Sequence, residues 1–393
     1  MTALSLPVSP DLRRRAITVA IEVADRLRSP ESVIATARRV RRPAGHPGWD
    51  ATALPAGHPG IALVHATMSV AEPSFAAATH AHLAAAAPGP AADLVPAVVL
   101  HTSVHGGYPK LLRSLAHAVA ESCEERVATH ARRAEPGADH GGVRGLAGVG
   151  RLLLALGDDH CGEALDTLLR HLVSRTRPVA ATAQPDVGLA NGLAAPLALM
   201  ALAHDRGHRV EGMADAMRAL VDPLLRAVGD EGDEAPSPDA AASAAWCRGT
   251  AGVARALHLA GIALGDAELC GAAVRALRGV VLRPWSQARL VGPTVCHGLA
   301  GLLQVVLRVS EHDPDPVLRA AAGVLAQRLL YSFDRTAPFG FRHAYRTRAG
   351  RFVAADEPGL LTGAAGVALA LATFAHHPGT VGPDVWDAPL LLS

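Results

Sequence analysis

The sequence is poor in aromatic residues, which make up 3% of the chain, and Lys110 is its only lysine. Strands favour aromatic and β-branched side chains. Half of this chain is apolar, however, and Ala, Leu and Val dominate that half. Ala and Leu are strong helix formers and allow helices to pack closely. We therefore predict an all-helical protein with a large buried core.

An excess of charge of one sign is also lacking, because 37 basic residues face 36 acidic ones. A chain without a strong positive field is not expected to recruit nucleic acid. The longest apolar runs, residues 193–203 and 363–375, are shorter than a membrane span, so none is expected. No basic region followed by an apolar core begins the chain, which predicts a cytoplasmic protein without a signal peptide. Five cysteines, an odd number, do not indicate a disulfide framework.

A glycine-rich turn followed by an apolar run recurs seven times along the chain. The apolar runs cover residues 61–68, 111–119, 149–156, 196–203, 253–264, 302–309 and 367–374. More polar helical stretches lie between them, at residues 162–173, 210–228, 266–281 and 316–330. A helix that is apolar on most sides must be buried, and an amphipathic helix covers it. The alternation predicts seven helical hairpins closed into a ring, with the apolar helices inside.

The chain is expected to form a single domain over residues 1–393, in which residues 1–50 are an N-terminal helix and loop leading into the ring. Residues 11–27 have the spacing of an amphipathic helix, and the Pro- and Arg-rich residues 30–55 are expected to be loop. Glycine before a helix permits a tight turn and close approach of backbones. If all inner helices begin at one end of the ring, their N-termini favour anions there, thiolates included. The alternative is a structural helical array whose glycines serve packing only.

Two of the turns carry metal-binding residue types. Cys247 lies in the fifth turn, and Cys296 and His297 lie in the sixth. Each cysteine stands two residues before the first glycine of its motif. An isolated buried cysteine is usually inert, but two thiols and an imidazole at matching positions form a ligand set that zinc accepts with one position open. We therefore predict one zinc ion held by Cys247, Cys296 and His297.

The motifs WCRGTAG, CHGLAG and LLTGAAG closely resemble those of the lanthionine synthetase C-like family, the lanthipeptide cyclases, and all seven turns match in order from Gly57. The resemblance implies an α/α toroid of seven inner and seven outer helices, with one zinc ion on Cys247, Cys296 and His297. It also implies Michael addition of cysteine thiolates to dehydroalanine or dehydrobutyrine in a ribosomally made precursor peptide. The products are lanthionine thioether rings. The implied partners are this dehydrated peptide and a dehydratase or other maturation enzyme.

The sequence departs from the family pattern around the metal ligands. Asn191 stands where the family usually has His, Gly141 where it has Asp, and Ser243 where it has Arg. Three catalytic residues are predicted in their place. Arg248 is a fixed cation that would stabilise an enolate, and Asn191 can form hydrogen bonds but cannot titrate. His140, next to Gly141, is the predicted proton carrier.

The basic residues 342–351 are predicted to be a solvated or substrate-facing loop. His343 and Tyr345 within it are further candidates for proton transfer. Two other functions remain open on the sequence. The first is a catalytically degenerate relative that binds or scaffolds the modified peptide and its maturation enzymes. The second is a different, hydrolytic zinc reaction in the same mouth.

Overall fold

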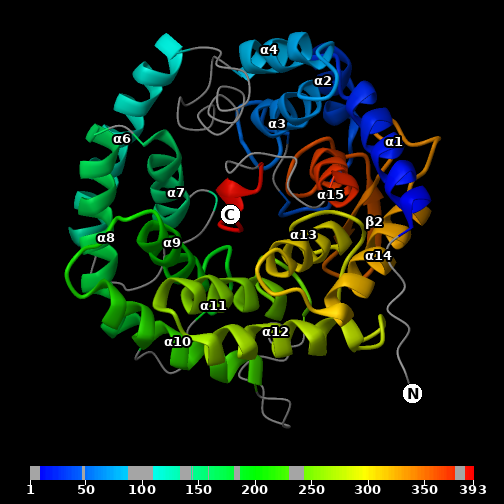
Figure 1. Ribbon diagram of the computed structural model, residues 1–393. Coiled ribbons are helices and arrows are strands. Elements are labelled where there is room, and N and C mark those ends of the chain that lie inside the picture. The colour runs from blue at the N-terminus through cyan, green and yellow to red at the C-terminus, as the bar shows by residue number, and fades with distance from the viewer. Residues whose placement is uncertain are drawn as a thin grey trace. The chain divides into compact units, whose positions relative to one another are not determined.

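The structure is a computed structural model that describes residues 9–46, 49–86, 109–132, 143, 145–157, 159–180, 186–229, 243–376 and 386–393. Their regular secondary structure is almost entirely helical, with one two-stranded sheet among these residues (Figure 1). They fall into two compact units. The first consists of Met1–Pro109, Leu290–Leu307 and Pro316–Trp386, and the second of Lys110–Arg289, Arg308–Asp315 and Asp387–Ser393. None of the helices within the described ranges has the length and hydropathy needed to cross a bilayer.

The first unit is built on two helices that are buried along most of their length, α3 and α15. Its elements are α1 (Pro10–Arg26), α2 (Pro30–Arg39), α3 (His58–Ser69), α4 (Phe75–Ala86), most of α13 (Leu299–Ser310), α14 (Pro316–Tyr331), β1 (His343–Arg346), β2 (Phe352–Ala355) and α15 (Ala364–His376). Helices α3 and α15 contact each other, while α4 packs on α3, and α1 and α14 pack on α15 (Figure 1). The predicted pairing of apolar and amphipathic helices is confirmed in this unit.

The prediction of a loop over residues 30–55 was wrong for its first part, which forms α2. Pro30 stands at the first helical position, where its missing N–H costs nothing because that group has no partner within a helix. The Ser29 hydroxyl caps the helix by accepting the N–H of Ser32 at 3.2 Å. Val33 and Ala37 are then buried on one face. The proline that suggested a loop is therefore the start signal of a helix.

The second unit repeats the alternation. It contains α6 (Pro109–Arg132), α7 (Leu146–Leu156), α8 (Asp159–Ala180), α9 (Ala194–Asp205), α10 (Met213–Gly229), α11 (Thr250–Leu264), α12 (Ala267–Leu282) and the 3₁₀ turn η1 (Ala388–Leu390). Helices α7, α9 and α11 are buried on nearly all sides, and α9 contacts both of the others. Helices α8, α10 and α12 expose one face. Helices α7 and α11 each end at a left-handed glycine, Gly157 and Gly265.

The apolar run at residues 111–119 was wrongly predicted to be a buried inner helix. It is part of α6, whose side chains alternate between buried and exposed positions. Leu115 and Ala116 are buried, whereas Arg113 and His117 are exposed. The run has enough polar positions for an amphipathic helix, and counting its apolar residues without regard to the polar positions between them led to the wrong prediction.

Three fully buried histidines, His58, His65 and His82, pack together in the first unit. The Nε2 atoms of His65 and His82 lie 3.2 and 2.8 Å from the carbonyl oxygen of Leu27, so each carries a proton that it donates. The Nδ1 of neutral His82 is then an acceptor, and His58 Nδ1 donates to it at 2.9 Å. Burial lowers the pKa values of His58, His65 and His82 to about 4, 4 and 3. The hydrogen bonds and the burial of the cluster therefore both favour neutral imidazoles.

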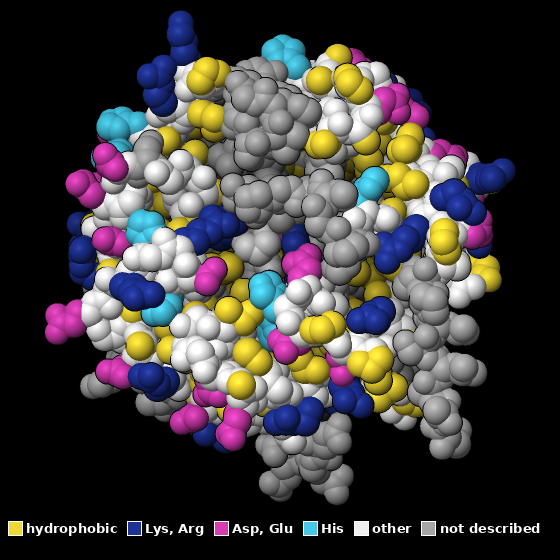
Figure 2. Space-filling model, in the orientation of Figure 1, with side chains coloured by type: hydrophobic (Ala, Val, Ile, Leu, Met, Phe, Trp, Pro, Cys, Tyr) yellow, Lys and Arg dark blue, Asp and Glu magenta, His cyan; other side chains and the backbone are white. Residues whose placement is uncertain are grey.

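The surface carries both signs of charge. On the face in Figure 2, basic and acidic side chains are interspersed, and the visible described residues form no broad patch of either sign. This distribution agrees with the formal net charge of +1.

Candidate functional site

The glycine-rich turns share one backbone geometry. In five of them the residue after the motif glycine donates its N–H to the carbonyl seven positions earlier, at 2.8–3.1 Å. The five donors are His58, Leu193, Thr250, Leu299 and Ala364. This bond closes a compact loop immediately before each helix. The glycine is required because a Cβ at Gly249 or Gly298 would collide with carbonyl oxygens of its own loop.

A second set of hydrogen bonds links one loop to the next. The donor and the acceptor both stand two residues before their motif glycine. In the second unit Ala190 N–H donates to the carbonyl of Cys247 at 2.9 Å. In the first unit the Cys296 N–H donates to the carbonyl of Leu361, and the Leu361 N–H donates to the carbonyl of Pro55, both at 2.9 Å. Both candidate metal-binding cysteines therefore occupy this linking position, where the backbone is held from a neighbouring loop.

The candidate ligands are divided between the units. Cys247 belongs to the second unit, whereas Cys296 and His297 belong to the first, so the three-residue zinc set stays a prediction. All three side chains are half-buried, and neither cysteine forms a disulfide. The His297 carbonyl accepts the N–H of Val291 at 2.8 Å, which fixes the backbone of this turn from within its own loop. Reduced thiols and an imidazole that are fixed in position but accessible to solvent suit zinc as donors.

The hairpin of β1 and β2 brings a second histidine to His297. The rings of His343 and His297 are 5.1 Å apart and nearly perpendicular. His343 is only 1% exposed, and its Nδ1 lies 3.0 Å from the hydroxyl of Thr294 in the same motif loop as His297. Burial, with smaller effects from His297 and His46, lowers the pKa of His343 to about 3. His343 is therefore a neutral ring packed against the candidate ligand.

Tyr345 continues this array away from His297. Its ring lies 4.5 Å from that of His343, and its hydroxyl donates to Glu357 Oε1 at 2.9 Å. Glu357 also accepts two hydrogen bonds from Arg42, at 2.7 and 2.8 Å. Burial, with a further effect of Glu357, raises the pKa of Tyr345 to about 12. The sequence indicated His343 and Tyr345 as candidates for proton transfer within a basic loop. Nothing in it indicated their contact with Glu357 and Arg42.

Arg248, one of the predicted catalytic residues, follows Cys247 and is exposed. Its Nε lies 3.9 Å from Asp186 Oδ2, and the two side chains are 63% and 44% exposed. Asp186 is held in turn, because its Oδ1 accepts the N–H of Gly188 at 2.9 Å. A Cβ at Gly188 would stand 2.6 Å from the Cys247 carbonyl, so this loop packs directly on the cysteine turn. The sequence did not identify Asp186, although its place six residues before the motif glycine was a usable signal.

The other two predicted catalytic residues have different outcomes. Asn191 lies in the loop that contacts Cys247, and its side chain is exposed and forms no hydrogen bond among the described residues. His140 lies outside the described residues. The catalytic roles of Arg248, Asn191 and His140 thus stay predictions.

A second group with metal-binding residue types lies within the second unit, where side-chain atoms of His258, Cys270 and Asp313 are all within 4.8 Å of one another. The guanidinium of Arg255 donates to His258 Nδ1 at 3.0 Å, so the ring proton is on Nε2, which donates to Asp313 at 2.6 Å. A metal-bound histidine has the opposite arrangement, because its free nitrogen donates to an acceptor. The buried cation of Arg255 opposes a metal further. This group is a hydrogen-bonded support.

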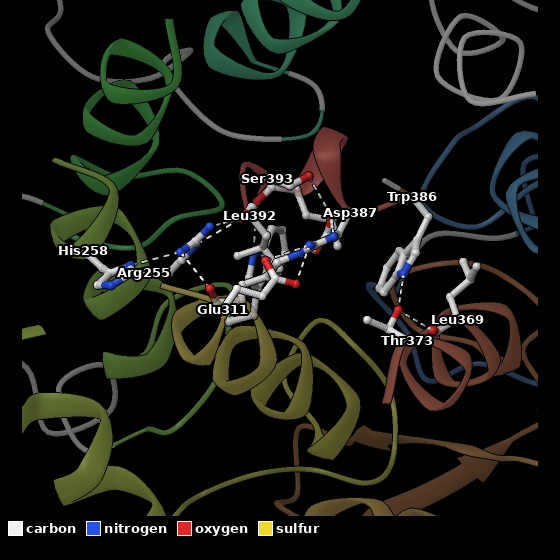
Figure 3. A network of polar contacts seen from close by, with 12 residues as sticks. Arg255, His258, Glu311, Leu369, Thr373, Trp386, Asp387, Leu392 and Ser393 are labelled. Atoms are coloured by element: carbon white, nitrogen blue, oxygen red, sulfur yellow. Dashed lines mark hydrogen bonds and ion pairs between the residues drawn. The ribbon is translucent and has the colours of Figure 1, made fainter. Parts of the chain in front are cut away.

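Arg255 and Arg308 hold the C-terminal segment within the second unit. Figure 3 shows Arg255 with its acceptor Leu392. Arg255 donates two hydrogen bonds to the Leu392 carbonyl, at 2.9 and 2.6 Å. Arg308 forms a bidentate pair with Asp387, at 2.7 and 3.0 Å. Both arginines lie on mostly apolar helices, where a charge is costly unless it is paired. The C-terminal segment supplies the hydrogen-bond acceptors that stabilise the two buried guanidinium groups on these helices.

A family model described as "Lanthionine synthetase C-like protein" matches residues 48–377. The chain belongs to this family. Among solved structures, this lanthionine synthetase C-like chain is similar to "Nisin cyclase", with 16% identity, 98% of each chain covered and a TM-score of 0.71. That similarity confirms the predicted fold class, an all-α α/α toroid. No curated protein matches the chain in sequence.

A second solved structure is titled a possible member of the GH105 family, from Salmonella enterica subsp. enterica serovar Paratyphi A. It is 12% identical, with 80% of this chain and 94% of the other covered, and its TM-score is 0.39. That score is too low to support an argument.

Proposed function

We propose that the protein is a zinc-dependent cyclase that forms lanthionine or methyllanthionine rings in a ribosomally made peptide. The observation that carries this proposal is the equivalence of Cys247 and Cys296. Each stands at the loop-linking position of its motif, with the backbone held by a neighbouring loop, and His297 follows one of them. Membership of the lanthionine synthetase C-like family supports the same chemistry.

The proposed ligands are Cys247, Cys296 and His297, with about one zinc ion per chain and one position left for a substrate thiol. When bound, zinc lowers the pKa of a coordinating thiol and so makes a thiolate available at neutral pH. His343 packs against His297 and limits the orientations of its ring. Thr294 fixes His343 in turn. The hairpin thereby restricts the orientation of His297, one of the proposed ligands.

The ring-forming step adds the peptide's cysteine sulfur to the β-carbon of dehydroalanine or dehydrobutyrine, residues that a dehydratase makes beforehand. The thiol loses its proton, a C–S bond forms, and the α-carbon gains a proton, so the peptide mass does not change. Negative charge develops on the carbonyl oxygen during this addition. Arg248 is the cation that would stabilise it, and the amide of Asn191 would donate a hydrogen bond. His140 is the residue we propose as proton donor to the α-carbon.

The alternative is a non-catalytic member that binds the modified peptide or scaffolds its maturation enzymes. Asn191 is the observation that favours it, because an exposed amide replaces a titratable histidine. Both functions require a peptide-binding surface, but only the cyclase consumes thiol.

The test uses a synthetic peptide that contains one cysteine and one dehydroalanine. For the cyclase, free thiol is lost without a change in mass, and the purified protein holds about one zinc ion per chain. Cys247→Ala and Cys296→Ala abolish both results. Cys270→Ala, which removes another half-buried thiol, retains both. Peptide binding without thiol loss supports the scaffold, and wild-type protein without zinc refutes the proposed metal site.

A further inference from the structure

The hairpin next to His297 has one open edge. Strands β1 and β2 are antiparallel, and in the described part of the chain they are the only strands of their sheet. The other edge of β1 faces the rest of the unit, where a Cβ at Gly292 would stand 3.7 Å from the Ala344 nitrogen and His46 Nε2 lies 3.4 Å from the Arg346 carbonyl oxygen. Among the described residues, the backbone N–H and C=O groups on the outer edge of β2 therefore have no partner strand.

The open strand exposes apolar side chains. Phe352 is 58% exposed and Val353 is 40% exposed, and Ala354 is exposed as well. Strand β1 differs, since His343 and Tyr345 are buried against the rest of the unit. An exposed apolar edge strand is a ready template for pairing with another extended chain.

The hairpin is also strongly basic. Arg346, Arg348 and Arg351 are exposed, and no acidic residue occurs between His343 and Ala355. None of the three arginines takes part in an ion pair among the described residues. The next acidic residue along the chain, Asp356, is paired with Arg342 at 3.0 Å. Three cations without an ion-pair partner among the described residues, at the end of β1 and in the turn that follows it, favour an acidic partner.

Arginines on an edge strand also have a protective role, because charge discourages edge-to-edge aggregation. Protection alone does not account for Phe352 and Val353, since a protected edge has no need of exposed apolar side chains. A partner strand that carries both acidic and apolar residues matches all of these features.

The register gives the docking site a direction. Ala355 pairs with His343, which contacts His297, and Phe352 pairs with Arg346 at the far end. The strand is four residues long, so its ends are about 10 Å apart at roughly 3.4 Å per residue. A peptide bound along β2 would have one end near His297 and the other beside the arginines.

We infer that β2 docks an extended acidic segment of the precursor peptide by strand addition, with its acidic side chains facing Arg346, Arg348 and Arg351. This inference rests on the proposed function for the identity of the peptide. The backbone edge supplies affinity without regard to sequence, and the arginines select acidic segments.

The test titrates full-length protein with a short fluorescent peptide of alternating Asp and Val and follows fluorescence anisotropy. Wild-type protein binds it saturably, and added salt weakens the binding. The variant Arg346→Glu/Arg348→Glu/Arg351→Glu weakens binding by about tenfold or more. The matched control Arg15→Glu/Arg319→Glu/Arg335→Glu makes the same change in net charge at exposed positions of the same unit and leaves the dissociation constant within about twofold. Equal weakening by both variants overturns the inference.

Strand addition is tested separately with a probe of the same charge. N-methylation of two adjacent central residues removes a hydrogen bond to β2 in either register, so this probe binds about tenfold more weakly or not at all. Equal affinity of the two probes overturns strand addition, and so does the absence of binding by wild-type protein.

The zinc proposal fails or succeeds independently of the docking site. Cys296→Ala is expected to lose zinc and thiol consumption yet to bind the acidic probe as wild type does. Loss of probe binding in this variant places the binding elsewhere and overturns the docking site. Conversely, the triple hairpin variant is expected to keep its zinc and to consume thiol in a peptide that lacks acidic residues.

Discussion

The substitution Glu357→Ala should destabilise the first unit strongly. Glu357 and Arg42 form a pair in which the two side chains are only 5% and 11% exposed, and the Tyr345 hydroxyl donates to the same carboxylate. Removing the carboxylate leaves a guanidinium and a phenol without their acceptor in a buried position. Breaking one side of a buried pair costs about 3–5 kcal/mol. We expect the free energy of unfolding to fall by this amount.

Companion variants separate charge from hydrogen bonding. Glu357→Gln keeps one acceptor oxygen and should lose about 1.5–3 kcal/mol, because hydrogen bonds to charged groups are the stronger ones. Tyr345→Phe removes a single donor and should lose about 1–2 kcal/mol. The double variant Arg42→Met/Glu357→Leu should recover much of the loss, since no buried charge is left alone.

The measurement is urea-induced unfolding followed by circular dichroism. Arg218→Ala is the matched control, because it breaks the Arg218–Asp215 pair, whose side chains are 64% and 74% exposed. That loss should be below about 1 kcal/mol. If Glu357→Ala costs no more than this control, the pair is not the support of the hairpin that its geometry indicates, and the reasoning fails.

Two further predictions concern the first unit's histidines and the loop at Cys247. The pKa values of the buried histidines are lowered, so between pH 6.5 and about 4 the unfolded chain binds more protons than the folded protein does. The free energy of unfolding should therefore decrease as the pH is lowered, by about 1.4 kcal/mol per pH unit for each histidine. Urea unfolding at pH 7 and 5 tests this, with a shallower dependence expected for His82→Gln; equal stabilities refute it. Gly188→Ala should reduce both the zinc content and the free energy of unfolding, because the alanine Cβ would collide with the Cys247 carbonyl oxygen. Zinc content and stability equal to those of the wild-type protein would contradict this prediction.

Much of the helical pattern was predictable from local sequence. The apolar runs at residues 149–156, 196–203 and 253–264 became α7, α9 and α11, and the stretch at 316–330 became α14. Each element is determined by periodicity over a few turns, and α7, α9 and α11 also by the glycine-rich turn before them. Misassignments arose where a local signal has two readings. Pro30, the first residue of α2, is of a type that starts a helix as readily as it ends one.

The candidate site was predictable only in part, for the same reason. Cys247, Cys296 and His297 stand out because their motifs repeat, and the structure adds that both cysteines occupy the same loop-linking position. Asp186 beside Arg248 was missed because the two residues lie in different repeats. Their approach depends on the packing of one loop on the next.

The sequence by itself determined the helical class, the repeating turns, the family and the candidate zinc ligands, because each is written in short-range patterns of residue type. Only the tertiary structure decided which residues surround them. His343 contacts His297 across a hairpin, and Arg42 meets Glu357 across 315 positions of the chain. Such contacts depend on how distant segments pack, and burial gives them their strength by removing water from charged and polar groups. No local pattern in the sequence encodes the packing of distant segments.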